Sequence, residues 1–431
     1  MTATTTFLER PSLAAPVLLP LLARLRPQLA ARAAEHDREG SFPHENFELL
    51  QAHGLVGITA PAAFGGSGAS LATARQVIRA VAHADPATAL VLTMTYLQIR
   101  QLNRPGGRWP IHLREKVSRD TVDRGALVNT LRVEPELGSP TRGGLPGTVA
   151  RRQADGSWRL DGHKMYSTGA PGLTWLTVWA RTEEGDGAPP RVGNFLVPRQ
   201  APGVRMIETW DHLGLRASGS HEVVFEQVAL PADHAVDVRP QAAWAPDALT
   251  PADRDAFADQ QAWMTVLLGT LYDAVAQAAR DWTLDFVRQR APGSLGAPLS
   301  TLPRVQETLG EIAALLNTNH LVLNQLTDTT DDGAPPAATD SGLAKYTVTH
   351  NAVAVVERAL KLTGNHGLSR HNPLERHLRN VLCGPVHAPQ DDALLVAAGR
   401  ALLAQAAPLP AAPLAPVQAE SPPTAAHEPA I

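Results

Sequence analysis

Two short segments in the middle of the chain combine residue types that can bind a flat, polar ligand. In residues 133–139 the pair Glu134-Pro135 is followed by Gly138-Ser139, and residues 162–168 place Gly, Lys, Tyr and Thr at alternating positions. A Gly-Ser pair after a strand exposes backbone N–H groups and a small hydroxyl to a ring lying against it. An ordinary surface turn has the same composition, so the pair gains meaning only from the elements that position it.

Those elements form three blocks. Residues 12–122 have apolar residues at spacings of three and four, which predicts helices. Residues 123–234 hold seven short β-branched or aromatic runs separated by Gly, Pro and Asp, which predicts a compact β-sandwich or barrel. Residues 250–406 contain four long helical patterns, which predicts a four-helix bundle. The Pro/Ala-rich residues 407–431 are typical of a disordered tail. The predicted fold class is α+β, with the β domain between two helical domains.

Composition argues against several classes of protein. Hydrophobic residues make up 44% of the 431 residues, and the formal net charge is −4 with no basic block, so we expect no nucleic-acid partner. Cys383 is the only cysteine, which rules out an internal disulfide and a cysteine-rich metal cage and fits a reducing cytoplasm. No apolar stretch reaches membrane-spanning length. We therefore expect a cytoplasmic protein with neither a metal site nor a membrane partner.

Five segments, taken in order, resemble the acyl-CoA dehydrogenase family of flavoproteins over roughly residues 15–405. The two segments above are similar to the family's Thr-Glu-Pro-x-x-Gly-Ser-Asp flavin loop and to its Gly-x-Lys-x-x-Ile-Thr-Asn strand. Three more resemble its glycine-rich loop in the first helical block, the end of its β domain, and its Gly-Gly-x-Gly and Pro-x-Glu-Arg-x-x-Arg-Asp region; they are residues 54–68, 213–231 and 364–379. Each motif alone is weak, but their shared order is specific.

The resemblance implies a flavin site along the β domain. Thr130, Arg132 and Val133 occupy the strand that borders the flavin in the family. Gly138 and Ser139 fall where a backbone group and a hydroxyl meet the isoalloxazine ring and the substrate thioester. The chemistry requires a flat apolar slot with donors near the ring edge.

The resemblance also implies a cofactor shared between subunits. Tyr166 takes the place of the family's aromatic residue beside the flavin, and Thr168 that of its hydroxyl near N5. Arg288, Gly364 and Gly367 fall where a neighbouring subunit holds the diphosphate and adenine. We therefore expect FAD, with FMN as the alternative, in a homo-oligomer that is a dimer or a tetramer.

The resemblance breaks at the catalytic base. Acyl-CoA dehydrogenation needs a carboxylate that removes the α-proton while hydride leaves the β-carbon for the flavin. Most of the family place a Glu just before the last helix, where this chain has Ala388. Some members carry the Glu on the first bundle helix, and counting back from Gly269 gives Asp259. Asp259 is the candidate base, although an exposed acid at a helix start looks the same.

His387 suggests a different reaction. The run His387-Ala388-Pro389 resembles a His-x-Pro found in the flavin-dependent monooxygenase branch of the fold, where the imidazole assists a flavin C4a-peroxide. Three hypotheses follow. The first is a dehydrogenase of an acyl thioester, which the β-domain motifs favour. The second is a reduced-flavin-dependent monooxygenase of a small heteroatom-containing molecule, and the third is a flavin-binding protein without catalysis.

Overall fold

The computed structural model describes residues 13–137, 144–185, 187–245 and 248–405. Gly138, Ser139 and the tail 407–431 lie outside them. The first block is helical, as predicted, because apolar residues recur on one face of each long helix. Its bounds are α1 (Ala15–Ala30), α2 (Ala33–Glu39), α3 (His44–Ala52), α4 (Leu71–Ala84), α5 (Pro86–Leu102) and α6 (Ile111–Arg124). The polar side chains of Ser70 and Asp85 accept from the first backbone N–H groups of α4 and α5, which fixes where these helices begin.

The β domain is one sheet in the order β6-β7-β3-β2-β4-β5-β8, and β1 pairs in parallel with β4 off this path. Its last strand lies where the composition suggests only a connector. This strand contains Val236 and Val238 and pairs with β5, although Pro and Ala residues surround it in the sequence. The strand bounds are β1 (Leu127–Leu131), β2 (Val149–Arg152), β3 (Trp158–Lys164), β4 (Leu173–Glu183), β5 (Arg191–Pro198), β6 (Val204–Ile207), β7 (Glu222–Leu230) and β8 (Ala235–Pro240).

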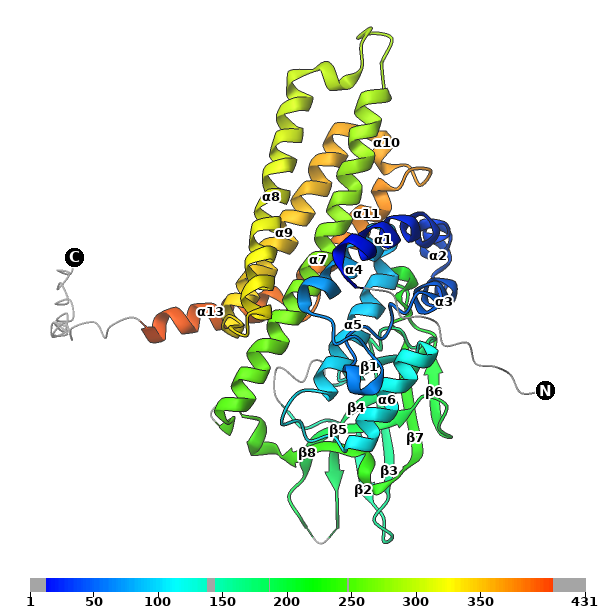
Figure 1. Ribbon diagram of the computed structural model, residues 1–431, viewed down its shortest axis with the longest axis vertical. Helices are drawn as coiled ribbons and strands as arrows, with labels where there is room; N and C mark the ends of the chain where they lie inside the picture. The colour runs from blue at the N-terminus through cyan, green and yellow to red at the C-terminus, as the bar shows by residue number, and fades with distance from the viewer. Residues whose placement is uncertain (1–12, 138–143, 186, 246–247, 406–431) are drawn as a thin grey trace, which may run out of the picture.

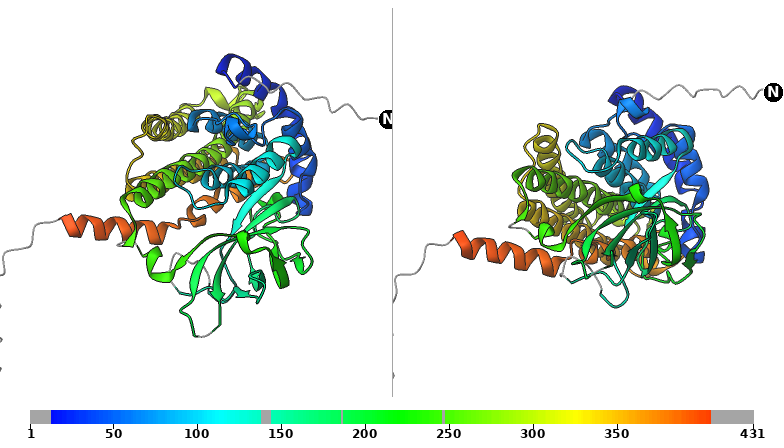
Figure 2. Two further views of the ribbon diagram at one scale, coloured as in Figure 1. Left: turned by 60° about the horizontal axis from the view of Figure 1, so that its bottom comes forward. Right: turned by 90° about the horizontal axis from the view of Figure 1, so that it is seen from below.

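Three long helices of the last block run alongside one another above the sheet (Figure 1). They are α7 (Pro251–Gln289), α8 (Pro303–Asp331) and α9 (Ala338–Thr363), followed by α10 (Asn365–Leu368), α11 (Leu374–Val381), α12 (Cys383–Val386) and α13 (Asp391–Gln405). The fourth predicted bundle helix, α13, contacts α9 but projects away from the body (Figure 2). Leu402 and Leu403 on it are exposed.

Helix α4 of the first block packs against α7, where the prediction placed the fourth helix of the last block. The C-terminal residue of α8 also joins the two blocks, because the Asp331 carboxylate accepts from the backbone N–H groups of Leu71 (2.8 Å) and Ala72 (2.9 Å) at the start of α4. This carboxylate satisfies donors that a helix start otherwise leaves unpaired. The first and last blocks therefore share one hydrophobic core.

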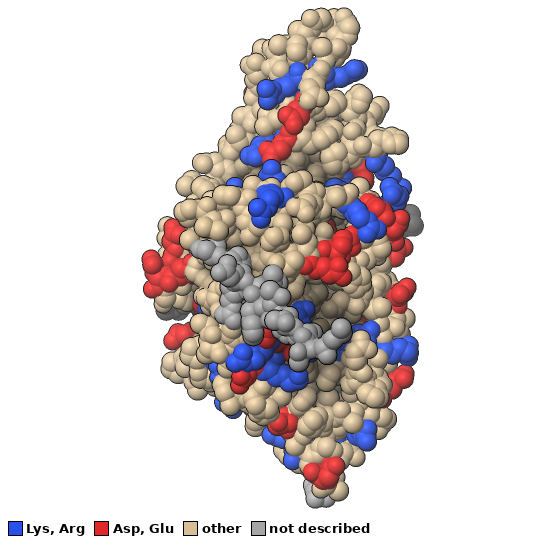
Figure 3. Space-filling model, turned by 45° about the vertical axis from the view of Figure 1, so that its right-hand side comes forward, with Lys and Arg blue, Asp and Glu red and all other residues tan. Residues whose placement is uncertain are grey.

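No helix in the described part of the chain is long and apolar enough to cross a membrane. On the face drawn in Figure 3, basic and acidic side chains are intermixed, and neither sign covers a broad area.

One core residue makes the stability of the fold depend on pH. His377 on α11 is 6% exposed, its Nδ1 has no hydrogen-bond partner, and burial lowers its pKa to about 3. As the pH falls below about 6.5, the unfolded chain takes up a proton at His377 that the folded chain does not. The contribution of this histidine to stability is therefore present at neutral pH and is lost on acidification.

We expect His377→Leu to reduce this acid sensitivity. Between about pH 7 and pH 4, the loss of unfolding free energy should be smaller by about 3 kcal/mol than in the wild type. Urea denaturation at both pH values measures the difference, with His371→Leu, an exposed histidine, as the matched control. An equal loss in wild type and His377→Leu would contradict the assignment.

Candidate active site

The ends of β1 and β3 lie side by side, as the sequence predicts for the flavin edge. The Met165 N–H donates to the Val133 carbonyl at 3.0 Å, and Asn129 Nδ2 donates to the Thr168 carbonyl at 3.0 Å. Thr130 belongs to the same strand as Asn129. The structure therefore brings the predicted residues of β1 next to those that follow β3.

A buried ion pair holds the ends of β1 and β3 together. Lys164 Nζ lies 2.6 Å from Glu134 Oε1, with side-chain exposures of 0% and 5%, and also donates to the Trp179 carbonyl. Glu134 accepts further from the backbone N–H groups of Gly147 and Thr148. Burial lowers the pKa of Lys164 to about 8 against the opposing effect of Glu134. The two residues shared with the family motifs therefore hold the flavin-edge backbone rather than meet a ligand.

A row of hydroxyls ends at Thr168. The Oγ atoms of Ser218 and Ser220 lie 2.8 Å apart, and Ser220 Oγ donates to Thr168 Oγ1 at 3.0 Å. Because Thr168 accepts this bond, its own proton is available to an acceptor on a ligand. The neighbouring Ser167 Oγ is buried without a hydrogen-bond partner. These donors fit the polar edge of an isoalloxazine ring.

Two more predicted residues lie at the surface of this edge. Tyr166 has a left-handed backbone (φ 54°) and a ring that is 49% exposed. The Arg132 guanidinium lies 4.5 Å from the centre of the Trp179 ring, and among the described residues no carboxylate pairs with it. An exposed ring and an unpaired cation are available to a bound cofactor or substrate.

His387 lies in a turn that a buried lysine holds. The Lys345 side chain on α9 is fully buried, and its Nζ donates to the carbonyls of Pro385 (3.3 Å), His387 (2.9 Å) and Pro389 (3.1 Å). It also pairs with Asp391 at 3.2 Å. One ammonium group therefore fixes the backbone on both sides of the imidazole.

Tyr272 on α7 orients the imidazole itself. Its hydroxyl lies 2.9 Å from His387 Nδ1, and burial raises the tyrosine pKa well above 10. The phenol therefore stays protonated. Because Nδ1 is its one hydrogen-bond partner among the described residues, the phenol donates to Nδ1, which leaves the ring proton on Nε2. Burial, with a smaller contribution from Lys345, lowers the pKa of His387 to about 4. At neutral pH the imidazole is uncharged.

We expect Lys345→Met to loosen this turn. Three carbonyls lose a charged donor, so the free energy of unfolding should fall by about 2 kcal/mol. The pKa of His387 should rise toward its ordinary value, because a nearby cation is removed. Denaturation and NMR titration of the imidazole measure the two effects. Lys361→Met, an exposed lysine on the same helix, is the control, and a variant indistinguishable from it would contradict the prediction.

The turn with His387 adjoins the loop that carries the serines. A Cβ added at Gly214 would come within 2.9 Å of Cys383 Sγ, and the Leu215 N–H donates to Asn380 Oδ1 at 2.8 Å. The His387 N–H donates to the Cys383 carbonyl at 3.0 Å. The turn that carries His387 therefore lies beside the start of the loop that leads to Ser218 and Ser220.

The other predicted residues lie along α7 in different places. Both Asp259 carboxylate oxygens accept from Arg100, and Asp259 precedes Tyr272 by 13 residues, about 20 Å along the helix. The structure therefore does not bring the two catalytic candidates together. Arg288 lies in the last turn of α7, where the rings of Phe286 and His366 are 5.2 Å apart. That contact places Arg288 near the turn containing Gly364 and Gly367.

Three family models match the chain: the acyl-CoA dehydrogenase N-terminal domain at residues 23–106, the middle domain at 132–228 and the C-terminal domain at 265–388. The chain belongs to the acyl-CoA dehydrogenase family. Members of the family are flavin-dependent oxidoreductases, and the flavin site described above is consistent with that cofactor.

Relatives within the acyl-CoA dehydrogenase family fall into two groups. YdbM of Bacillus subtilis, named as an acyl-CoA dehydrogenase, is 33% identical over 377 residues, covering 87% of this chain and 93% of YdbM. L-evernosamine nitrososynthase of a Micromonospora species is 32% identical over 405 residues, covering 89% of each chain. KijD3, whose structure holds FMN and dTDP-3-amino-2,3,6-trideoxy-4-keto-3-methyl-D-glucose, is 30% identical in sequence with a TM-score of 0.77. The match covers 93% of this chain and 97% of KijD3.

Sequence reasoning missed Tyr272 and Lys345. They lie 115 and 42 residues from His387, so no local spacing relates them to it. The one available signal is that each is a polar residue on the apolar face of its helix.

Proposed function

We propose that this family member is a reduced-flavin-dependent monooxygenase that oxygenates a nucleophilic heteroatom of a small molecule. The observation that carries the proposal is the hydrogen-bonded pair of Tyr272 and the uncharged His387. The next residue, Ala388, occupies the position at which most dehydrogenases of the family carry their catalytic Glu. Acyl-CoA oxidation needs a carboxylate base, and alanine cannot accept a proton.

The chain's own residues supply positioning and one hydrogen-bond donor. A reduced flavin, when bound, would supply the two electrons that, with two protons, allow one atom of O₂ to be transferred to the substrate and the other to leave as water. Thr168, with its free proton, orients the ring edge. His387 presents an Nε2–H whose tautomer Tyr272 fixes, and such a donor stabilises developing negative charge on an oxygen.

The relatives support an amine as the heteroatom. Nitrososynthases named for amino sugars are 30–32% identical to this chain, and the ligand in the KijD3 structure carries a 3-amino group.

Acyl-CoA dehydrogenation is the second candidate, favoured by the likeness to YdbM. Asp259 would then be the base. Both of its oxygens accept from Arg100, so a substrate would have to displace that arginine before the carboxylate took a proton. This requirement is the reason for placing dehydrogenation second.

We also propose that Arg288, Gly364 and Gly367 hold the far end of a flavin that belongs to a neighbouring subunit. Arg288 follows Tyr272 by 16 residues, about 24 Å along α7, which is too far to share one isoalloxazine ring with Tyr272. Arg288→Ala should weaken binding of FAD more than binding of FMN. Equal loss for both flavins would contradict a diphosphate contact.

The test of the main proposal compares two reactions of the purified protein. With FMN, a flavin reductase, NADH and ¹⁸O₂, a panel of small amines should yield a product containing one labelled oxygen atom. Anaerobic mixing of the flavin-loaded protein with acyl-CoAs should leave the flavin absorbance unchanged. Bleaching by an acyl-CoA, without labelled product from any amine, would establish the dehydrogenase instead.

A further inference from the structure

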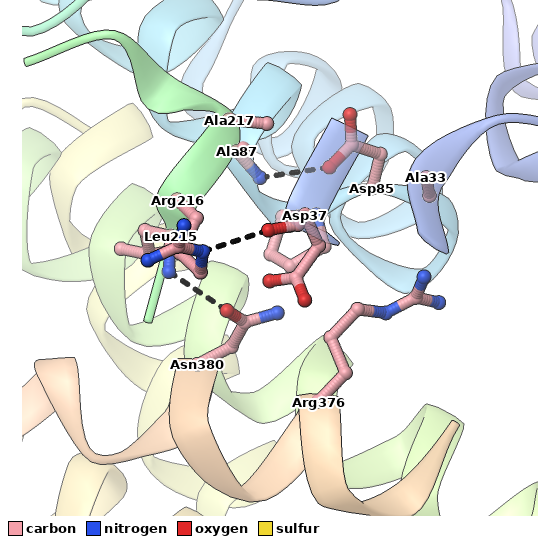
Figure 4. Close-up of a pocket in the computed structure, with 10 residues that line it drawn as sticks. Ala33, Asp37, Asp85, Ala87, Leu215, Arg216, Ala217, Arg376 and Asn380 are labelled. Atoms are coloured by element: carbon pink, nitrogen blue, oxygen red, sulfur yellow. Dashed lines mark hydrogen bonds between the residues drawn. The ribbon is translucent and has the colours of Figure 1, made fainter. Parts of the chain in front are cut away.

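A cavity of about 490 Å³ lies where the three blocks of the chain meet. One wall is α2, the second is the segment after β6 that holds His212 and Arg216, and the third is the segment from Arg370 to Arg379. The volume is in the range of sites that hold small organic ligands and is larger than one inorganic phosphate needs. Figure 4 shows the neighbouring junction, where Arg376 extends from α11 toward α2.

Positive charge dominates the lining. Five arginines and two carboxylates face the cavity, in a chain whose formal net charge is −4. Both carboxylates are already engaged, because Arg379 pairs with Asp37 at 2.6 Å and with Glu375 at 2.8 Å. Arg216 pairs with Asp211 and donates to the Asp37 carbonyl.

Three of the arginines have no such partner. Among the described residues, the guanidinium groups of Arg38, Arg370 and Arg376 make no hydrogen bond or salt bridge, although Glu35 and Asp85 lie near enough to Arg38 and Arg376 to interact with them electrostatically. The three arginines line two separate walls of the cavity. Guanidinium forks that are not hydrogen-bonded to carboxylates match the paired oxygens of phosphate groups.

An aromatic surface connects the cavity to the flavin edge. The His212 ring, which lines the cavity, stacks on Trp210 with centroids 3.7 Å apart and planes 13° apart. Tyr166 meets His212 edge-on at 5.8 Å. Flat rings of this kind support a nucleobase or another π system. A ligand that reaches from Tyr166 into the cavity would therefore meet aromatic rings first and cations next.

We propose that this cavity binds a diphosphate group, with Arg38, Arg370 and Arg376 as its ligands. A diphosphate carries enough charge and length to contact cations on two walls. The group can come from a nucleoside-diphosphate-linked substrate or from coenzyme A. Assignment to a substrate rests on the proposed function, whereas binding of the diphosphate itself does not.

The experiment measures binding to the flavin-loaded protein by calorimetry at one fixed low salt concentration. Inorganic pyrophosphate is the first probe, followed by dTDP, coenzyme A and ADP. Arg38→Gln/Arg370→Gln removes two exposed, unpaired cations, so folding should be preserved. Arg304→Gln/Arg400→Gln removes two exposed arginines elsewhere and matches the change in net charge. Thermal unfolding checks that both variants are folded.

The expected result is that pyrophosphate binds the wild type and the control alike and binds the cavity variant about tenfold or more weakly, as loss of charge-assisted hydrogen bonds requires. The nucleotide that loses most affinity in the cavity variant identifies the source of the diphosphate. No binding of pyrophosphate to the wild type, or equal weakening in both variants, overturns the proposal. Because the oxygenation test uses amines without phosphate, either proposal can fail while the other stands.

Discussion

Replacing His387 with Gln should lower the rate of amine oxygenation by about 10²–10³-fold, the usual cost of removing a positioned hydrogen-bond donor. Glutamine can still hydrogen-bond to Tyr272, but its flexible amide does not hold an N–H at the position of the imidazole Nε2–H. The donors that we propose for the isoalloxazine ring come from the β domain, so flavin affinity should not change. Product formation and hydrogen peroxide release are measured together, and we expect peroxide to increase as product decreases.

The control for this prediction is His320→Gln, an exposed histidine on α8, which should behave as the wild type. Because the pKa of His387 is lowered to about 4, protonation of the imidazole should not limit the wild-type rate between about pH 5 and pH 8. Wild-type rates in His387→Gln, with product and peroxide unchanged, would remove the imidazole from the mechanism and with it the main support for the monooxygenase.

Replacing Lys164 with Met should lower the free energy of unfolding by about 3–5 kcal/mol, the cost of leaving one member of a buried ion pair without its partner. Glu134 would keep its backbone donors but lose the cation 2.6 Å away. Because Glu134 directly follows Val133, whose carbonyl accepts from Met165, the flavin edge should also loosen. Guanidinium denaturation and a flavin-binding titration measure the two effects.

The double variant Glu134→Gln/Lys164→Met separates a charge effect from a packing effect. It removes both charges, so it should recover a large part of the stability that Lys164→Met loses. If the double variant is no more stable than the single one, an unpaired buried carboxylate is not the cause of the loss.

The order of the blocks and the flavin edge could be predicted from sequence because they depend on local patterns. Residues 133–137 and 162–168 lie on either side of a short hairpin, so chain connectivity helps to keep them close. The surroundings of His387 depend on contacts between distant helices, and neither Tyr272 nor Lys345 follows from any spacing near it. The projection of α13 from the body could not be predicted from sequence either, because its apolar pattern resembles that of a packed helix. Only the structure shows that α4 already packs against α7, where a fourth bundle helix would lie.

The packing of α4 against α7 has a consequence for how the chain acquires its structure during synthesis. Helices α4 and α5 leave the ribosome about 150 residues before α7 begins, which at typical rates of translation is a delay on the order of ten seconds. During that time the faces of α4 and α5 that pack on α7 have no partner, and the Asp331 that caps α4 arrives later still. The first block is therefore a separate unit in sequence, but part of its apolar surface stays exposed until α7 and α8 have been synthesised.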